Sequence, residues 1–423
     1  MSSSKKVINA WAMYDWANSA YSLIITSAIF PAYYTAIAPP QINFLGRTFE
    51  RSALASYAIS FSFLVIAVLS PILSSIADYK GNKKKFMKFF CYIGSAACCS
   101  MFFFTKENIG WGIIASVIAS IGYSGSIVFY NAYLPEIADE NEQDNVSAKG
   151  FALGYIGSVI LMVLCLAAIM LNDKMNLGWG SLPARFSFVA VGIWWAGFAQ
   201  ITFNRLPASK PAQQNLQHSI LTNGFYELKK VFHQLFALPR LSRFLRAFFF
   251  FNMGVQTVMY LATYFASDEL KMQDTQLIIT VLIIQLVAIA GATMFAKLSN
   301  KTNNIFTLSV LILIWIGICF FASKVYTATE FYIIAFCVGL VMGGIQSMSR
   351  STYSKLLPAT KDTASFFSFY DVCDKIGTVI GTLSFGYVSE FLGGMRNSVL
   401  ALMIFFIIGF VLLLMVKMKE KIV

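Results

Sequence analysis

Long apolar runs alternate with short polar segments along almost the whole sequence. A helix needs about 20 apolar residues to cross the hydrocarbon core of a bilayer. Twelve runs reach that length, at about 8–37, 52–77, 86–105, 110–134, 149–171, 184–205, 241–266, 275–297, 304–323, 331–356, 363–389 and 397–416. The sequence therefore predicts an all-α polytopic membrane protein with 12 transmembrane helices.

The composition excludes the soluble classes of protein. Of the 423 residues, 57% are hydrophobic and 12% are charged, whereas an average soluble domain carries about 25% charged residues. In a membrane protein the net charge of +12 does not indicate a nucleic-acid partner. All seven cysteines lie inside apolar runs, where they are expected to pack as small hydrophobic side chains.

An enzyme is not expected. Twelve spans leave no room for a separate catalytic domain, and both histidines, His218 and His233, lie in one polar segment. The cysteines and histidines show no spacing that is typical of a metal site. The sequence thus predicts no catalytic residue, no metal ion and no cofactor.

The positions of the basic residues predict how the chain is oriented. Most of the 32 Lys and Arg residues fall in the two terminal tails and in 78–88, 205–246 and 350–361. Because Lys and Arg accumulate in cytoplasmic loops, both termini are expected in the cytoplasm. The opposite loops lack Asn-x-Ser/Thr sites, which suits a multi-pass protein of the plasma membrane of a bacterium, the inner membrane.

A polar interruption divides the chain into three parts. Residues 1–205 are expected to form an N-terminal six-helix bundle, residues 206–240 a cytoplasmic linker, and residues 241–423 a C-terminal six-helix bundle. Apolar residues of the linker recur at spacings of four and three, namely Leu221, Phe225, Leu228, Phe232 and Leu235. This spacing predicts an amphipathic helix that lies on lipid headgroups. The helix would either brace the two bundles against each other or merely tether them.

The two bundles echo each other in sequence. Leu134-Pro135 ends the fourth run and Leu357-Pro358 ends the tenth, and each is followed by a short turn and a glycine-bearing helix. Transporters built from two repeats bind their substrate near the bilayer midplane, at the interface between the repeats. The expected architecture is therefore two pseudo-symmetric six-helix bundles around a central site.

Polar residues inside the apolar runs mark the candidate site, because a charge at the centre of a span costs about 2.5–3.5 kcal/mol on insertion scales. One face of the first run carries Asp15, Asn18 and Ser19, and one face of the seventh run carries Asn252, Gln256 and Tyr260. We expect both faces to line a central cavity. For the first run, a packing stripe between helices is the alternative.

The eleventh run contains three ionisable residues within one helical turn: Asp371, Asp374 and Lys375. At 1.5 Å per residue they lie roughly 12–18 Å into the helix, near the middle of a bilayer. The i, i+4 spacing predicts that Asp371 pairs with Lys375 and leaves Asp374 as a surplus acid. A buried structural salt bridge is the alternative to a functional site. If a proton (H+) drives transport, Asp374 or Asp15 is its expected carrier.

A polar stripe near the end of the tenth run includes Gln346 and Arg350. Arg350 would bind a carboxylate, form an inner gate or anchor the cytoplasmic end of the helix. These three roles remain open from the sequence.

The loop SSIADYKGNKKK between the second and third runs resembles the signature loop of the major facilitator superfamily, G-x-x-x-D-R-x-G-R-K. Asp78, Gly81 and Lys83 match its acid, its glycine and its final base, whereas Ser74, Tyr79 and Asn82 depart from it. The resemblance implies that this gating loop stabilises the outward-open state, with the acid at a helix terminus and paired with a base. It also implies the major facilitator fold.

Four further motifs are similar to the autophagy-related vacuole-effluxer-like branch of that superfamily: YDWANSAYS, YNAYLPEIA, GGIQSMSRS and FFSFYDVCDKIG. The resemblance implies a secondary active transporter, embedded in membrane lipids, that moves a small polar solute. We expect the transporter to be a monomer. Fungal members are associated with amino-acid efflux from the vacuole, so an amino acid is the expected solute class. Sugars or peptidoglycan fragments, and a receptor or scaffold without transport, are the alternatives.

Overall fold

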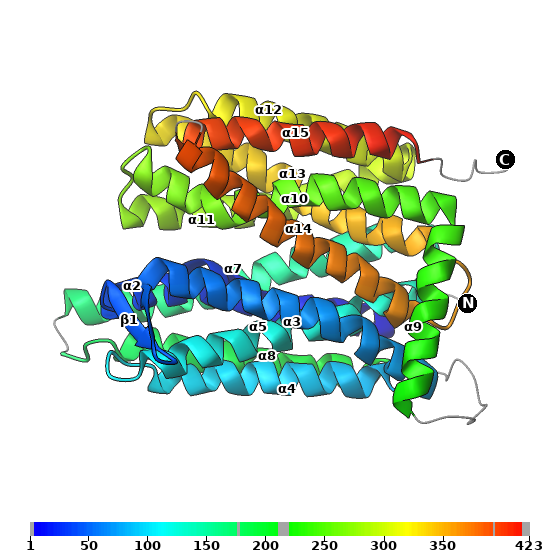
Figure 1. Ribbon diagram of the computed structural model, residues 1–423, viewed down its shortest axis with the longest axis horizontal. Helices are drawn as coiled ribbons and strands as arrows, with labels where there is room; N and C mark the ends of the chain where they lie inside the picture. Colours follow the sequence, from blue (N-terminus) through cyan, green and yellow to red (C-terminus); the bar gives the residue numbers. More distant parts are fainter. Residues whose placement is uncertain (1–3, 176–177, 210–219, 392–393, 417–423) are drawn as a thin grey trace.

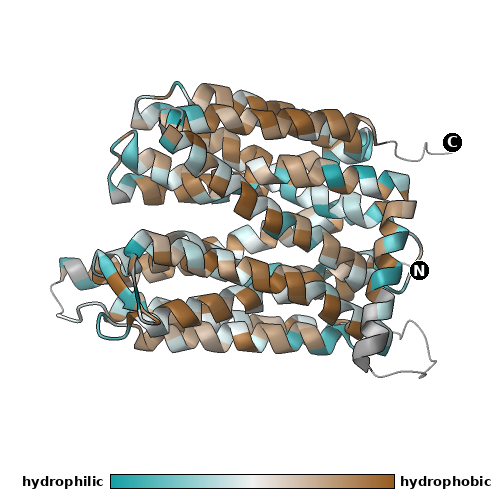
Figure 2. Ribbon diagram, in the orientation of Figure 1, coloured by the Kyte–Doolittle hydropathy of each residue, from teal (hydrophilic) through white to brown (hydrophobic). Residues whose placement is uncertain are grey.

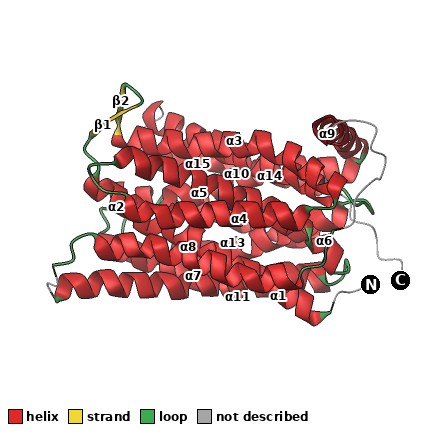
Figure 3. Ribbon diagram, turned by 90° about the horizontal axis from the view of Figure 1, so that it is seen from below, coloured by secondary structure: helices red, strands yellow, loops and turns green. Residues whose placement is uncertain are grey.

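The structure, a computed structural model, describes residues 4–175, 178–209, 220–391 and 394–416. Helices account for nearly all of it (Figure 3). The elements up to residue 205 are α1 (Lys5–Ala20), η1 (Tyr21–Ala28), α2 (Ile29–Ile37), β1 (Gln41–Phe44), β2 (Arg47–Glu50), α3 (Arg51–Lys80), α4 (Lys83–Ser100), η2 (Met101–Phe103), α5 (Ile109–Ala132), α6 (Leu134–Ile137), α7 (Gln143–Lys174) and α8 (Leu182–Arg205). Those that follow are α9 (Ile220–Ala237), α10 (Pro239–Asp268), α11 (Asp274–Lys301), α12 (Asn304–Ala322), α13 (Ala328–Leu356), α14 (Thr363–Phe391) and α15 (Met395–Leu414).

The long helices form two bundles side by side (Figure 1). In the first bundle α1 packs against α7 and α8, α4 packs against α5 and α8, and α3 packs against α5. In the second, α10 packs against α14 and α15, α11 against α13, and α12 against α13 and α15. The two-bundle, all-α fold predicted from the apolar runs is confirmed.

Within the described residues, 11 helical segments are long and apolar enough to cross a membrane. The remaining predicted span forms α14, which has 29 residues and packs within the same assembly. Its four charged residues, Asp371, Asp374, Lys375 and Glu390, lower its hydropathy, so α14 differs from the other spans by its chemistry and not by its length. Figure 2 shows hydrophobic residues along most helices and hydrophilic ones gathered toward the helix ends.

Two local features have no counterpart in the sequence-based expectation. The first span contains a π-helical segment, η1, between α1 and α2, and such segments are frequent at functional sites. The loop after α2 folds into a hairpin in which β1 pairs antiparallel with β2. We call the end of the molecule that carries this loop the hairpin end.

Helix ends follow local chemistry. Gly81 has φ +67° and ends α3 in the left-handed conformation that glycine adopts without strain. Thr327 begins α13 with a capping box, in which its side chain accepts from Glu330 N and the Glu330 carboxylate reaches back to the cap. These signals fix where the spans stop and the loops begin.

The linker helix α9 lies across the opposite end of the molecule, which we call the α9 end (Figure 1). It contacts α3 of the first bundle and α10 and α14 of the second. Val231 and Leu235 are buried, and the Phe232 ring centroid lies 5.9 Å from that of Phe369 of α14. The side chains of Leu221 and Phe225, predicted on the same face, lie outside the described residues. Contact with both bundles favours a brace over a simple tether.

The bundles meet along a few helices. Helix α3 packs against α14, α7 packs against α11 and α13, and α5 packs against α14. The ribbons of the two bundles converge at the α9 end and diverge toward the hairpin end (Figure 1). This geometry places the inner faces of α1, α7, α10, α13 and α14 around the middle of the molecule.

Candidate functional site

A compact polar group lies between α10 and α14. We call it the central cluster, and it comprises Asn252, Gln256, Asp374 and Lys375. Lys375 Nζ donates a 2.7 Å hydrogen bond to Asp374 Oδ2. Asp374 Oδ1 accepts two further bonds of 2.7 Å, from Asn252 Nδ2 and Gln256 Nε2. Because the two amides are four residues apart on α10, they reach the same carboxylate. The cluster thus combines one cation, one anion and two amides.

Asp371, one helical turn before Lys375, has a different environment. Its Oδ1 lies 3.8 Å from Lys375 Nζ, and its Oδ2 is buried without a hydrogen-bond partner. Its side chain is 6% exposed, compared with 16% for Asp374. The predicted contact between Asp371 and Lys375 is present at 3.8 Å, but the prediction that Asp374 is left as the surplus acid is wrong, because Asp374 makes the closer contact with Lys375, at 2.7 Å. Helix spacing could not reveal this, because the donors that hold Asp374 come from α10.

One aromatic ring of the first bundle lies over the cation of the central cluster. The ring centroid of Phe63 on α3 lies 5.3 Å from Lys375 Nζ, within reach of a cation–π interaction. The Tyr260 ring of α10 lies 6.2 Å from the Phe63 ring. Tyr260 therefore contributes to the site through this aromatic contact between the bundles.

Arg350 on α13 forms a second group, the arginine cluster, with Asp15, Tyr130, Asn131 and Ser147. Arg350 Nη1 donates to Asp15 Oδ2 at 3.1 Å, and its Nε and Nη2 donate to Ser147 Oγ and to the Ser147 carbonyl at 2.9 and 2.8 Å. Tyr130 Oη donates to the same Asp15 oxygen at 2.8 Å. Asp15 and Arg350 are 4% and 3% exposed. This buried ion pair joins α1 of the first bundle to α13 of the second.

Glycines of α7 make room for the arginine cluster. A Cβ atom at Gly150 would lie 2.5 Å from Asp15 Oδ2 and 2.9 Å from Arg350 Nη2. A Cβ atom at Gly154 would lie 2.4 Å from Ser19 Oγ. Helix α7 can therefore approach α1 closely only where these positions carry no side chain.

Gly150→Ala is expected to separate Asp15 from Arg350 and to destabilise the protein by about 1–3 kcal/mol, since the added methyl group overpacks a buried site. Gly197→Ala on α8 is the matched control, because nothing lies within 4 Å of its added Cβ. Thermal unfolding in detergent measures both variants. Equal melting temperatures for the two variants would show that the close approach at Gly150 does not matter.

Other predicted residues lie near these two groups. Gln346 Oε1 on α13 accepts a 2.6 Å hydrogen bond from Tyr155 Oη on α7, which is a second link between the bundles. Asn18 is buried, and its Nδ2 has no hydrogen-bond partner. Ser19 Oγ lies 3.5 Å from Asn18 Oδ1. The polar face predicted for the first span therefore packs against α7 around Ser19, with Asp15 paired to Arg350.

A first lock joins the gating loop to α14 at the α9 end. Asp78 Oδ2 accepts from the Ser365 backbone at 2.7 Å and from Ser365 Oγ at 2.8 Å, and Asp78 Oδ1 lies 3.6 Å from Lys83 Nζ. Lys83 Nζ also donates to Thr363 Oγ1 at 2.7 Å and to the Glu136 carboxylate. An acid at the N-terminus of a helix is favoured by the free N–H groups and the helix dipole. Gly81 shapes the turn that brings this loop to α14.

A second lock joins α7 to the second bundle at the same end. Asp144 Oδ2 accepts from Lys355 Nζ at 2.7 Å and from Ser299 Oγ at 3.0 Å, and its Oδ1 accepts from Asn304 Nδ2 at 2.8 Å. Asp144 is 1% exposed. Each lock thus uses one bundle's acid to hold polar groups of the other bundle.

Comparison with known proteins identifies the chain. A family model described as vacuole effluxer Atg22 like matches residues 3–423. The chain belongs to this family. An uncharacterized MFS-type transporter of Bacillus subtilis, YxiO, is 33% identical over 411 residues, which cover 96% of this chain and 93% of YxiO. Autophagy-related protein 22 of Yarrowia lipolytica is 22% identical over 464 residues, covering 90% of this chain and 78% of that protein.

Solved structures show the same fold for this Atg22-like transporter. A structure of the E. coli fucose:proton symporter FucP superposes with a TM-score of 0.71 at 14% identity and covers 98% of each chain. A structure of the proton:xylose symporter XylE gives a TM-score of 0.70 at 11% identity and covers 97% of this chain and 95% of that chain. The protein is therefore a multi-pass membrane transporter with the major facilitator fold, not an enzyme, as predicted.

Sequence reasoning missed the second lock of this Atg22-like transporter. Asp144 and Lys355 lie in polar segments at the ends of spans, where charged residues are ordinary. The internal repeat could have indicated this contact. Lys355 lies just before Leu357-Pro358, and Asp144 follows the equivalent pair Leu134-Pro135 in the first half. Tyr130 and Glu136 were also missed, although both lie in the quoted motif YNAYLPEIA.

Lys355→Met is expected to weaken contact between the bundles at the α9 end, because it leaves the buried Asp144 carboxylate without its cation. Breaking a buried pair costs about 3–5 kcal/mol, which destabilises the contact between the bundles at the α9 end. The bundles should then separate at the α9 end and approach each other at the hairpin end. Spin labels at Leu45 and Tyr326, which are 87% and 73% exposed, report this approach as a shorter distance. Lys297→Met, which removes an exposed lysine near the same end, is the control. An unchanged label distance in Lys355→Met would contradict the lock.

Proposed function

We propose that this Atg22-like protein is a secondary active transporter that moves a small polar solute by alternating access, with an amino acid as the favoured class. The central cluster carries the proposal, because a partly exposed cation, anion and amide pair lie together in the middle of the molecule. The first and second bundles, with α9 as their connection, are the proposed moving bodies. The proposed transporter acts as a monomer, in which the two bundles of one chain move against each other.

A zwitterion matches the chemistry of the central cluster. Lys375 is suited to a solute carboxylate and Asp374 to a solute ammonium group, since charge-assisted hydrogen bonds are the strong ones. Asn252 and Gln256 offer donors and acceptors to the rest of the solute. Sugars and peptidoglycan fragments would use the amides but leave the charge pair without a role.

The proposed gate is the arginine cluster together with the two locks. These contacts lie between the central cluster and the α9 end and join α1, α7 and α3 to the second bundle. We assign the α9 end to the cytoplasm, because basic residues concentrate there and cytoplasmic loops are enriched in Lys and Arg. The state described is then closed to the cytoplasm, and the solute would reach the cluster from the hairpin end.

Radiolabelled solutes in proteoliposomes test the proposed function. The panel comprises neutral amino acids, monosaccharides and muropeptides, each assayed by counterflow and by uptake with and without a pH gradient. We expect counterflow of at least one amino acid. If only sugars or only muropeptides show counterflow, that class and not amino acids is the solute. If no solute of the panel shows counterflow, the protein is better explained as a receptor or scaffold.

A further inference from the structure

We propose that Asp371 is the proton-binding group that couples transport to a proton gradient. The coupling role of Asp371 rests on the proposed function, whereas its ability to bind a proton follows from the charges and contacts around it. It moves the coupling role from Asp374 and Asp15 to Asp371, whose Oδ2 is the fully buried carboxylate oxygen of the three residues that has no hydrogen-bond partner.

The acidic side chains in the middle of the molecule outnumber the basic ones. Asp15 and Arg350 form a neutral pair, and Asp374 and Lys375 form another. The three acids then outnumber the two cations by one, and Asp371, which is 5% exposed, makes the longer contact, 3.8 Å, with the lysine that it shares with Asp374. A buried carboxylate whose nearest cation is already bound to another acid favours a proton, because desolvation of its charged form is costly. A proton on Asp371 makes the whole group neutral.

The hydrogen bonds of the two aspartates on α14 also favour Asp371 as the proton-binding group. Asp371 Oδ2 is buried and has no partner, so it has room for an O–H bond. Asp374 lacks that room, since Lys375, Asn252 and Gln256 already donate to its two oxygens. A proton on Asp374 would have to displace one of these donors.

The groups around Asp371 define how protonation would reach the solute. On α14 its electrostatic neighbours are Lys375, Asp374, Tyr370 and Cys373. The titratable or charged groups near the cluster from other helices are Tyr260 of α10, Tyr123 of α5, and Tyr353 and Arg350 of α13, while α3 contributes the Phe63 ring. Lys375 is the shared element, because its Nζ lies 2.7 Å from Asp374 and 3.8 Å from Asp371.

This sharing provides the coupling. When Asp371 loses its proton to water, its negative charge attracts Lys375 and competes with Asp374 and with a solute carboxylate. When Asp371 takes up a proton from water on Oδ2, Lys375 is released to serve Asp374 and the solute. Proton binding and solute binding therefore favour each other, and linkage requires that the effect is reciprocal.

Infrared difference spectroscopy on the purified protein tests the proton site without any solute. A pH change across about 5 to 9, above the range in which exposed Asp titrates, should produce the carbonyl stretch of a protonated carboxyl group that shifts in D2O. We expect Asp371→Asn to remove this band and Asp371→Glu to restore one. Glu390→Gln, on the same helix, should retain it, whereas Asp374→Asn, which frees Lys375 to pair with Asp371, should move the band to lower pH. No such band in the wild-type protein, or a band that survives Asp371→Asn, would overturn the proposal.

Transport assays separate this inference from the proposed function. With the amino acid that gives counterflow, Asp371→Asn should lower uptake driven by a pH gradient by at least about tenfold more than it lowers counterflow, a difference of about 1.4 kcal/mol. Equal losses would overturn the coupling role and leave the solute site standing. A band that depends on Asp371 in a protein that transports no solute would support the proton site and contradict the proposed function.

Discussion

Replacing Asp374 by alanine is expected to abolish solute counterflow. The change removes the acceptor that Lys375, Asn252 and Gln256 share, and Lys375 is then free to turn to Asp371. Truncating one partner of a buried charge pair in a binding site costs about 2–5 kcal/mol, which corresponds to a loss of solute affinity of about 30-fold to several thousandfold. Binding to the purified variant and counterflow in proteoliposomes measure the effect.

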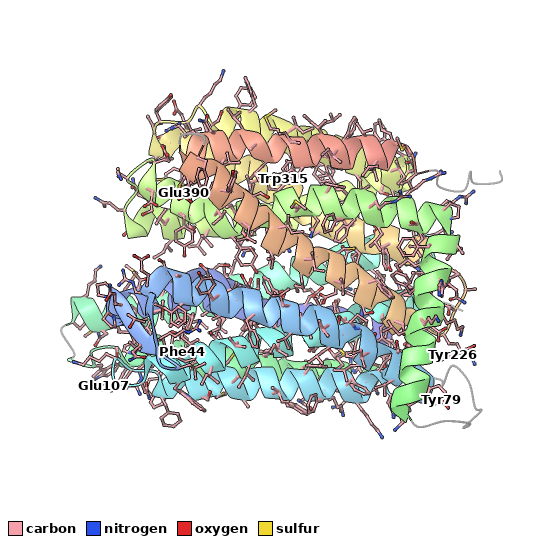
Figure 4. The ribbon with its side chains drawn as sticks, in the orientation of Figure 1. Phe44, Tyr79, Glu107, Tyr226, Trp315 and Glu390 are labelled. Atoms are coloured by element: carbon pink, nitrogen blue, oxygen red, sulfur yellow. The ribbon has the colours of Figure 1, made fainter. Side chains whose placement is uncertain are left out.

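The control for this variant is Glu390→Gln. Glu390 lies on the same helix, is exposed, and lies near the hairpin end of α14 (Figure 4). We expect its counterflow to equal that of the wild-type protein. If Asp374→Ala and Glu390→Gln behave alike, the central cluster does not hold the solute.

Replacing Arg350 by methionine is expected to have the second largest effect. The variant leaves Asp15 buried with Tyr130 Oη as its described hydrogen-bond donor and removes the link between α1 and α13. We expect the described state to be destabilised by about 3–5 kcal/mol. The variant should have a lower melting temperature and should populate the state closed at the α9 end less than the wild-type protein does. The double variant Asp15→Asn with Arg350→Gln should recover part of this loss, because it leaves no unpaired buried charge.

Arg47→Met on β2 serves as the matched control for Arg350→Met, because Arg47 is exposed. Its melting temperature should not change. A double variant of Asp15 and Arg350 that is no more stable than Arg350→Met alone would show that the ion pair is not what holds the two bundles in this state.

The membrane fold could be read from the sequence because its signal is repeated and simple. Each span needs only length and apolarity, and the two Leu-Pro steps mark equivalent places in the two bundles. The η1 segment and the β1–β2 hairpin could not be predicted in this way. A π-helical segment has the same composition as the helix around it, and a short hairpin carries little hydrophobic pattern.

The candidate site was only partly readable from the sequence. Asp15, Asp374 and Lys375 stand out because ionisable residues in apolar runs are costly. Their partners do not stand out, because Asn252 and Arg350 reach them from other helices, and three-dimensional packing decides which oxygen receives which donor. The spacing on α14 alone therefore predicted Asp371 as the partner of Lys375, whereas Asp374 makes the closer contact in the structure.

Comparing the wild-type protein with Asp374→Ala in amino-acid counterflow tests the central claim most directly. We predict that the wild-type protein transiently accumulates at least one labelled amino acid against its unlabelled form and that the variant, reconstituted to the same protein content, does not. An amino acid that both proteins exchange at the same rate would contradict the assignment of the solute site to the central cluster.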